Sequence, residues 1–200
     1  MNNGSVGLYG AGGHAKVIID ILKENNITVS SVYDDDKSLT KLVDIPVIHD
    51  RLKNPTIISI GNNTVRKKIV DKLGSSTSYT KAISTKSIIS DTVKIGEGTV
   101  VMQGAIIQSS ASIGKHTIVN TGATIDHDCI IGDFVHIAPG CNLCGNVQVG
   151  EGALIGAGSV IIPGIKIGKW SVVAAGSVVF KDIGDNVLAI GNPCRVIKKI

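Results

Sequence analysis

The 200-residue sequence predicts a parallel β-solenoid of hexapeptide repeats, preceded by a small Rossmann-like α/β domain. An apolar residue returns at every sixth position from Ile83 to Val179, and a short fixed period of this kind is typical of solenoids. Within that stretch an Ile-Gly or Val-Gly pair recurs every eighteen residues, from Ile95-Gly96 to Ile167-Gly168. The preceding residues lack this period and alternate strand-like and helix-like segments. We therefore expect an α/β domain over 1–80, a solenoid over 81–184 and a C-terminal tail over 185–200.

The N-terminal segment begins with a strand-like run, Val6–Tyr9, that leads into a glycine-rich loop and an amphipathic helix ending near Lys23. Further strands are predicted at Val29–Tyr33 and Ile57–Ile60, and the second of these precedes a basic helix containing Arg66. A β-α-β order indicates a parallel sheet whose ligand site lies at the carboxyl ends of its strands.

The loop after the first strand fits the G-x-G-x-x-A pattern of dinucleotide sites, but the domain is about half the size of a full dinucleotide fold. We therefore expect a single nucleotide diphosphate on the helix N-terminus, with His14 facing the same cleft. Asp34 and Asp35 would then take a ribose or base, and Arg66 would support the phosphates. The alternative explanation of the glycines is a tight strand-to-helix turn without a ligand.

One coil of the solenoid takes eighteen residues in three short strands, and successive coils stack about 4.8 Å apart. In each repeat, the large aliphatic residue and a small residue four positions later point inward. Cys129 and Cys141 fall on the small inward position, whereas Cys144 falls on the outward side. Two thiolates on opposite sides of the coil wall cannot share a zinc ion, so we expect neither a metal site nor a disulfide at these cysteines.

Two histidines of the solenoid, His127 and His136, occupy positions that the repeat turns outward. His127 lies between Asp126 and Asp128, and a neighbouring carboxylate can fix the imidazole tautomer and raise its basicity, as a general base requires. Either aspartate is a candidate for this role. Gly145 lies eighteen residues later, so it is expected one coil above His127, with a cavity beside the base and a bare N–H for an oxyanion.

These motifs together resemble one family across essentially the whole chain. The glycine–histidine loop, the Asp34-Asp35 pair, the Asp-His-Asp segment and the Gly-Asn-Pro-Cys-Arg tail are similar to those of hexapeptide-repeat sugar acyltransferases. That group includes PglD-like N-acetyltransferases of the bacillosamine pathway and NeuD-like sialic acid O-acetyltransferases. The resemblance implies left-handed coils, a homotrimer, acetyl-CoA lying between adjacent subunits, and a nucleotide-linked amino sugar on the small domain.

The resemblance also implies roles for individual positions. His127 would be the general base and Asp128 its partner, while Gly145 would present its amide to the thioester carbonyl. Asn120 and His136 match polar residues near the acetyl group and the sugar amine. The nucleotide-sugar cleft would comprise Gly12, Gly13, His14, Asp34, Asp35, Gly61, Asn62 and Arg66. The CoA track would comprise Gly156, Ala157, Gly158, Ala175, Gly176, Pro193 and Arg195, and Cys194 departs from the alanine common in that tail.

Composition limits the remaining classes. The formal charge of +4 leans mildly towards an anionic ligand, and no basic run with interleaved aromatics indicates nucleic acid. No signal peptide or membrane-spanning run is evident, which predicts a cytoplasmic protein. We expect acetyl transfer from acetyl-CoA to a UDP-4-amino-4,6-dideoxy hexose, without a metal. The alternatives are sugar or sialic acid O-acetylation and a non-catalytic trimeric solenoid. A further alternative is an NAD-binding module, which the short length of the N-terminal unit disfavours.

Overall fold

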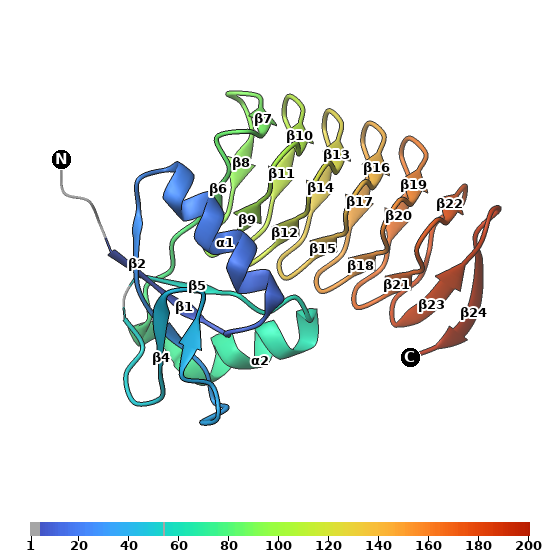
Figure 1. The fold of residues 1–200 in the computed structure, drawn as a ribbon. Helices are drawn as coiled ribbons and strands as arrows, with labels where there is room; N and C mark the ends of the chain where they lie inside the picture. The colour runs from blue at the N-terminus through green and yellow to red at the C-terminus, as the bar shows by residue number, and fades with distance from the viewer. Residues whose placement is uncertain (1–4, 54) are drawn as a thin grey trace.

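The N-terminal domain is a small α/β unit in the computed structural model, which describes residues 5–53 and 55–200 (Figure 1). Its five-stranded sheet has the order β3-β4-β2-β1-β5, and β1, β2, β4 and β5 pair in parallel. The antiparallel β3–β4 hairpin was not expected from the sequence. The strands are β1 (Ser5–Tyr9), β2 (Thr28–Tyr33), β3 (Lys41–Leu42), β4 (Ile45–Ile48) and β5 (Thr56–Ile58).

Two α-helices accompany this sheet, α1 (Gly13–Glu24) and α2 (Asn63–Leu73), and a 3₁₀ turn, η1 (Gly74–Ser76), follows. Helix α1 buries one apolar face, which includes Ile18 and Leu22, as its 3.6-residue spacing predicts. Helix α2 begins where the Asn62 side chain accepts a hydrogen bond from the Val65 N–H at 3.0 Å. None of the helices in the described segments is long and apolar enough to cross a bilayer.

The solenoid confirms the predicted hexapeptide period. Seventeen two-residue strands, β6 to β22, wind into three parallel sheets, and each strand pairs with the strands three before and three after it. The coils stack one above another along the molecule (Figure 1). The strands are Ala82–Ile83, Ile88–Ile89, Lys94–Ile95, Val100–Val101, Ile106–Ile107, Ser112–Ile113, Ile118–Val119, Thr124–Ile125, Ile130–Ile131, His136–Ile137, Asn142–Leu143, Gln148–Val149, Leu154–Ile155, Val160–Ile161, Lys166–Ile167, Val172–Val173 and Val178–Val179.

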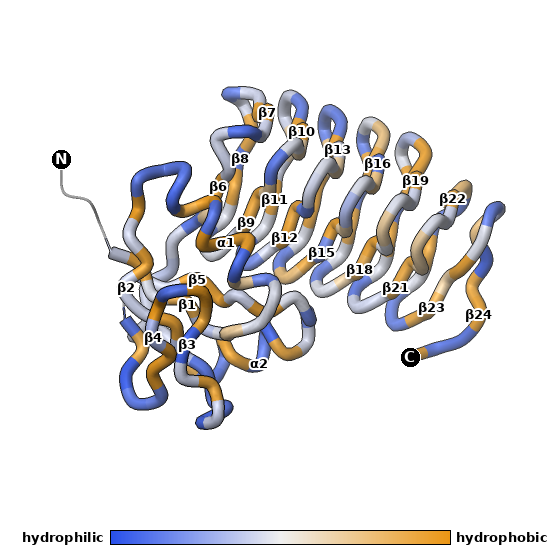
Figure 2. The backbone as a smooth tube through the Cα atoms, viewed as in Figure 1, coloured by the Kyte–Doolittle hydropathy of each residue, from blue (hydrophilic) through white to orange (hydrophobic). Residues whose placement is uncertain are grey.

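We name the three sheets by their first strands, so that they are the β6, β7 and β8 sheets of eight, six and five strands. The second residue of most strands is a fully buried aliphatic, and the small residue of the repeat is buried beside it, as with Ile125 and Cys129. The alternation of apolar and polar residues along the coils is visible in Figure 2. The interior is therefore filled by side chains and has no room for a ligand.

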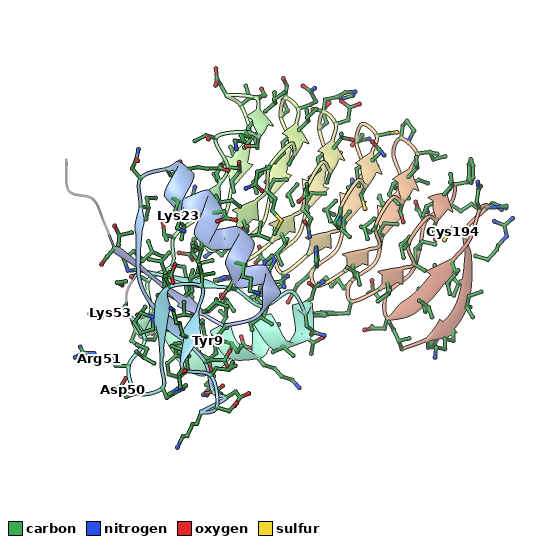
Figure 3. The ribbon with its side chains drawn as sticks, in the orientation of Figure 1. Tyr9, Lys23, Asp50, Arg51, Lys53 and Cys194 are labelled. Atoms are coloured by element: carbon green, nitrogen blue, oxygen red, sulfur yellow. The ribbon has the colours of Figure 1, made fainter. Side chains whose placement is uncertain are left out.

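The C-terminal tail continues the solenoid instead of leaving it at residue 184. Strand β23 (Val187–Ile190) pairs in parallel with β21, and β24 (Arg195–Lys199) pairs antiparallel with β23. Both therefore belong to the β6 sheet. The hexapeptide period ends before them, which is why the sequence placed this segment outside the repeat. Cys194 lies buried at this end of the molecule, far from Tyr9 in the N-terminal sheet (Figure 3).

Candidate active site

The candidate base, His127, lies at the corner between β13 and β14. Asp128 adopts a left-handed conformation there (φ 59°), which turns its carboxylate back towards the preceding side chain. Its Oδ2 lies 2.8 Å from His127 Nδ1, whereas Asp126 Oδ1 accepts the backbone N–H of His127, also at 2.8 Å. Asp128 therefore orients the ring and Asp126 orients the main chain.

Solvent exposure and charge both suit His127 to proton transfer. The His127 and Asp128 side chains are each 59% exposed, so a substrate has access to the ring. The hydrogen bond that His127 donates to Asp128, followed by the charge of Asp126, raises the pKa of His127 above its ordinary value of 6.5. Because Asp128 can only accept, Nδ1 carries the hydrogen in the neutral ring and Nε2 is left as the free basic nitrogen.

Gly145 lies against the His127 ring, one coil further along. A Cβ at this glycine would come within 2.6 Å of both Cε1 and Nε2 of His127. The expected cavity beside the base is therefore filled by the imidazole itself, and the glycine is what permits this position. Within residues 5–53 and 55–200, nothing accepts a hydrogen bond from the Gly145 N–H. This glycine is itself buried, so its N–H is a donor without a partner in the described part of the chain, next to the base.

His136 and Asn120 form a second cluster on the outer side of the β6 sheet. Asn120 Nδ2 lies 3.0 Å from His136 Nε2, and His136 Nδ1 lies 3.3 Å from the carbonyl oxygen of Gly61 in the N-terminal domain. His136 thus points out of the solenoid, as expected, but the N-terminal domain covers it. Burial, followed by the charge of Arg66, lowers the pKa of His136 to about 4.

Arg66 does not face a phosphate, which corrects the role expected from its place in a basic helix. The side chain is only 1% exposed. Its Nε donates to the His116 carbonyl at 2.8 Å, and its two terminal nitrogens donate to the carbonyls of Ile60 and Phe134, each at 2.9 Å. These bonds run both to the solenoid, at His116 and Phe134, and to Ile60 of the N-terminal domain itself, so Arg66 is buried at the domain boundary. Burial lowers the pKa of Arg66 to about 9.

The glycine-rich loop borders open space. A Cβ at Gly12 or Gly13 would meet no atom within 4 Å, so packing alone does not require glycine at either position. Asp34 Oδ2 accepts the Ala11 N–H at 2.7 Å and thereby holds the loop. Asp35 accepts the Tyr9 hydroxyl at 2.7 Å yet remains 60% exposed, so of the acidic pair it is the more accessible to a ligand.

His14 follows this loop, and burial lowers its pKa to about 4. Nearby His136 and Arg66 contribute in the same direction, which places the three side chains close together. His14 Nε2 is buried without a hydrogen-bond partner among the described residues. A buried polar nitrogen of this kind needs a partner, and a ligand in the cleft can supply one.

A cavity of about 570 Å³ lies between α2 and the solenoid. Gly61, Asn62 and His136, all expected at the site, line it. Lys67 of α2 and Trp170 of the solenoid also line it, and neither was predicted at the site. Trp170 occupies a corner of the repeat, eighteen residues after Gly152. Because Gly152 has no side chain, it leaves room for the indole ring, and this spacing was the signal in the sequence that could have found Trp170.

The residues expected along the CoA track differ in their surroundings. Gly158 and Gly176 stand at exposed corners where a Cβ would meet no atom within 4 Å, and Ala157, Ala175, Pro193 and Arg195 are also exposed. Gly156 is different, because a Cβ there would collide with the backbone of Ala174 and Ala175. Stacking of the coils therefore requires this glycine, whether or not a ligand lies nearby.

One copy of the chain does not unite these features. His127 lies at the corner where the β7 sheet meets the β8 sheet, whereas His136 and Asn120 lie on the β6 sheet, which forms the third wall of the solenoid. The candidate base and the covered histidine therefore face different sides of the prism.

Comparison with known proteins places this architecture among bacterial hexapeptide transferases. Residues 5–73 match the PglD N-terminal domain, and residues 128–163 and 146–181 match the bacterial transferase hexapeptide (six repeats). A histidine-to-asparagine variant of perosamine N-acetyltransferase from Caulobacter crescentus, in complex with CoA and GDP-perosamine, is 37% identical. Its TM-score is 0.92, and the match covers 98% of this chain and 97% of that one.

Two further relatives agree. The acetyltransferase domain of PglB from Neisseria gonorrhoeae, in complex with acetyl coenzyme A, has a TM-score of 0.90 at 31% identity, covering 96% of this chain and 98% of that one. UDP-N-acetylbacillosamine N-acetyltransferase from Bacillus subtilis is 41% identical over 115 residues, which are 49% of this chain and 51% of that protein. The chain thus spans about half the length of this curated relative, and 20% of a second, uncharacterised protein of Acanthamoeba polyphaga mimivirus.

The two domains and their order define a hexapeptide-repeat acyltransferase with a PglD-type N-terminal domain. On the identity and coverage of the solved structures, the chain belongs to the PglD-like family of sugar N-acetyltransferases.

Proposed function

We propose that this protein transfers the acetyl group of acetyl-CoA to the amine of a nucleotide-linked amino sugar. The observation that carries this proposal is the arrangement of Asp128, His127 and Gly145, in which an oriented, exposed imidazole lies beside a free backbone N–H. Of the relatives named above, the perosamine N-acetyltransferase variant is in complex with CoA and GDP-perosamine, and the PglB domain is in complex with acetyl coenzyme A.

The chemistry needs no covalent intermediate on the protein. The sugar amine attacks the thioester carbon while His127 Nε2 removes a proton from the amine nitrogen. The Gly145 N–H stabilises the oxyanion that forms as the C–N bond is made. The C–S bond then breaks, and the CoA sulfur leaves with the proton that His127 gives up. Asp128 stabilises the imidazolium between these two steps.

The acceptor would lie with its nucleotide on the loop of Gly12 and Gly13, close to Asp35, and with its sugar near His14 and Asn62. This proposal is supported by the open space above the loop and by the unpartnered nitrogen of His14. We infer a UDP-linked 4-amino-4,6-dideoxy hexose. The relatives' names include both UDP and GDP substrates, so thermal shifts with UDP, GDP, dTDP and CMP would discriminate between the nucleotides. A larger shift with GDP than with UDP would contradict the UDP assignment.

The active unit would be a homotrimer, with CoA between adjacent copies. The outer face of the β7 sheet carries an apolar stripe, in which Ile88 is 66% and the adjoining Phe180 48% exposed, together with the half-buried Ile106, Val160 and Val178. The polar Thr124 and Asn142 interrupt this stripe at its centre. An apolar stripe of this kind favours contact with another protein surface. His127 borders the same sheet, so a second copy packed on the stripe would bring its own residues to the base.

Complementation between inactive variants tests the function and the shared site together. We expect His127→Ala and His136→Ala each to abolish transfer to a UDP-4-amino sugar, measured as release of free CoA thiol. The two variants are mixed equally and reassembled from dissociated subunits. A shared site is then intact when the copy that supplies His127 carries His136→Ala and the copy that supplies His136 carries His127→Ala. Random assembly makes about one quarter of the sites intact, so about one quarter of wild-type activity should return. No recovery after verified mixing would contradict a shared site.

A further inference from the structure

His136 is held in a single protonation state by its hydrogen bonds. The Thr121 backbone N–H donates to Asn120 Oδ1 at 2.8 Å, which fixes the orientation of the Asn120 amide. Its Nδ2 then faces His136 Nε2 at 3.0 Å and must be the donor, because an amide nitrogen accepts no hydrogen bond. Nε2 of His136 therefore carries a lone pair. Nδ1 carries the hydrogen and points at the carbonyl oxygen of Gly61, 3.3 Å away.

Arg66 donates hydrogen bonds on both sides of the contact between His136 and Gly61. One terminal nitrogen, Nη1, donates to the Gly61 carbonyl at 3.2 Å and so holds the acceptor of the His136 Nδ1–H. The other, Nη2, donates to the carbonyls of Phe134 at 2.9 Å and Val135 at 3.4 Å, immediately before His136 in the chain. A planar guanidinium can make all of these hydrogen bonds simultaneously, whereas the ammonium group of a lysine cannot reproduce their forked geometry.

We propose that Arg66 is a positioning residue that, together with the fixed Asn120 amide, holds His136 as its neutral Nδ1–H tautomer. With one Nδ2 hydrogen given to His136, the second has no partner among the described residues and is available to an oxygen of a bound ligand. The contribution to turnover presupposes the acetyl transfer proposed above. The tautomer itself is a property of the free protein and does not depend on any substrate.

Two arguments favour this role over simple adhesion between the domains. A separate contact joins the two domains at Glu24, which accepts hydrogen bonds from Ser84 at 2.7 Å and Gln103 at 3.1 Å in the first coils of the solenoid. Three of the six hydrogen bonds of Arg66 instead go to carbonyls next to His136, those of Gly61, Phe134 and Val135. Its buried cation also disfavours a second positive charge on that ring, in the same direction as burial itself.

The tautomer can be measured directly in the unmodified protein. With ¹⁵N-labelled histidine, only five residues contribute, and a His136→Gln variant assigns the signal of interest. We expect long-range ¹H–¹⁵N correlations at neutral pH to show a protonated Nδ1 and a bare Nε2. An Nε2–H tautomer or an imidazolium at His136 would overturn the proposal without any further variant.

The kinetic comparison uses Arg66→Lys, which keeps the charge but loses the fork, with Glu24→Gln as the matched control at the same domain boundary. We expect Arg66→Lys to show a mixture of His136 tautomers and a kcat reduced by between about tenfold and about a hundredfold. The KM for acetyl-CoA should change by less than about twofold, since the guanidinium is buried and out of reach of a ligand. Glu24→Gln should alter the melting temperature alone.

A folded Arg66→Lys variant with pure Nδ1–H His136, or a Glu24→Gln variant with the same kinetic loss, would show a merely structural role. A wild-type protein that has the expected tautomer but transfers no acetyl group would overturn the proposed function and leave the hydrogen-bonded arrangement in place.

Discussion

Substitution of Gly145 by alanine tests the site with the smallest possible change. The residue is buried, and its φ lies outside the left-handed region, so alanine adopts the backbone conformation without strain. The added methyl group would meet Cε1 and Nε2 of His127 at 2.6 Å, while no other residue approaches it as closely. The group that must yield first is therefore the imidazole.

The size of the displacement follows from that contact. Ordinary van der Waals contact begins near 3.4 Å, so the ring has to retreat by about 0.8 Å from a methyl placed at 2.6 Å. His127 is 59% exposed and can move into solvent, which keeps the cost to folding small, within about 0.5 kcal/mol. A misplacement of about 1 Å costs on the order of a hundredfold in rate. We therefore expect a hundredfold effect on turnover with an almost unchanged melting temperature.

The assay is release of CoA thiol under saturating acetyl-CoA, alongside thermal unfolding of the same samples. Gly184→Ala is the matched control, because a Cβ at Gly184 would meet no atom within 4 Å and its backbone also lies outside the left-handed region. The control should retain full turnover. If Gly145→Ala retains more than about half of wild-type turnover, the reasoning that places the reacting atoms against this face of His127 is refuted.

Three other outcomes follow from the same structure. His127→Ala should keep CoA binding, measured by calorimetry, and lose about 10² to 10⁴ in kcat, and intact turnover would remove this residue as the base. Asp128→Asn should move the acid limb of the kcat/KM profile to lower pH, because the carboxylate holds the pKa of His127 above 6.5 and transfer needs the unprotonated ring. An acid limb that does not move would belong to the titration of another group. Ile155→Ala empties a fully buried position and should lower the free energy of unfolding by about 2 to 5 kcal/mol in denaturant titrations, while a cost under about 1 kcal/mol would contradict a packed interior.

The solenoid could be predicted from the sequence because its period is local. The inward position of each repeat carries a large aliphatic residue, as with Ile107, Ile125 and Leu143, and these three lie one above another in adjacent coils of the β7 sheet. The same stacking rule predicts Gly145 beside His127 from the eighteen-residue spacing alone. Asp128 was harder, because strand neighbours point to opposite sides, and only its left-handed corner lets it reach the ring.

The role of Arg66 could not be predicted, because its partners are distant in sequence. Its hydrogen bonds reach carbonyls at His116, Phe134 and Val135, fifty to sixty-nine residues away. A basic helix after a strand is an ordinary anion-site pattern, and nothing near Arg66 in the sequence distinguishes a buried arginine from a phosphate ligand. The same limit applies to His136, whose burial depends on how the N-terminal domain docks.

The docking of the N-terminal domain on the solenoid determines what would set the geometry of a site shared between two copies. Each copy holds its N-terminal domain on its own solenoid at two separated points, through Arg66 near α2 and through Glu24 at the end of α1. Asn63 adds a third contact, donating to the carbonyls of Gly152 and Ala153 at 3.0 Å. Arg66 and Asn63 belong to α2 and Glu24 to α1, so the domain is held to the solenoid through both of its α-helices. The acceptor site and His136 would then move as one body, so the distance from the acceptor amine to a neighbouring copy's His127 would be set by the contact between copies. Substitutions in the apolar stripe, such as Ile106→Asp, should for this reason abolish turnover while His136 keeps its tautomer within each chain.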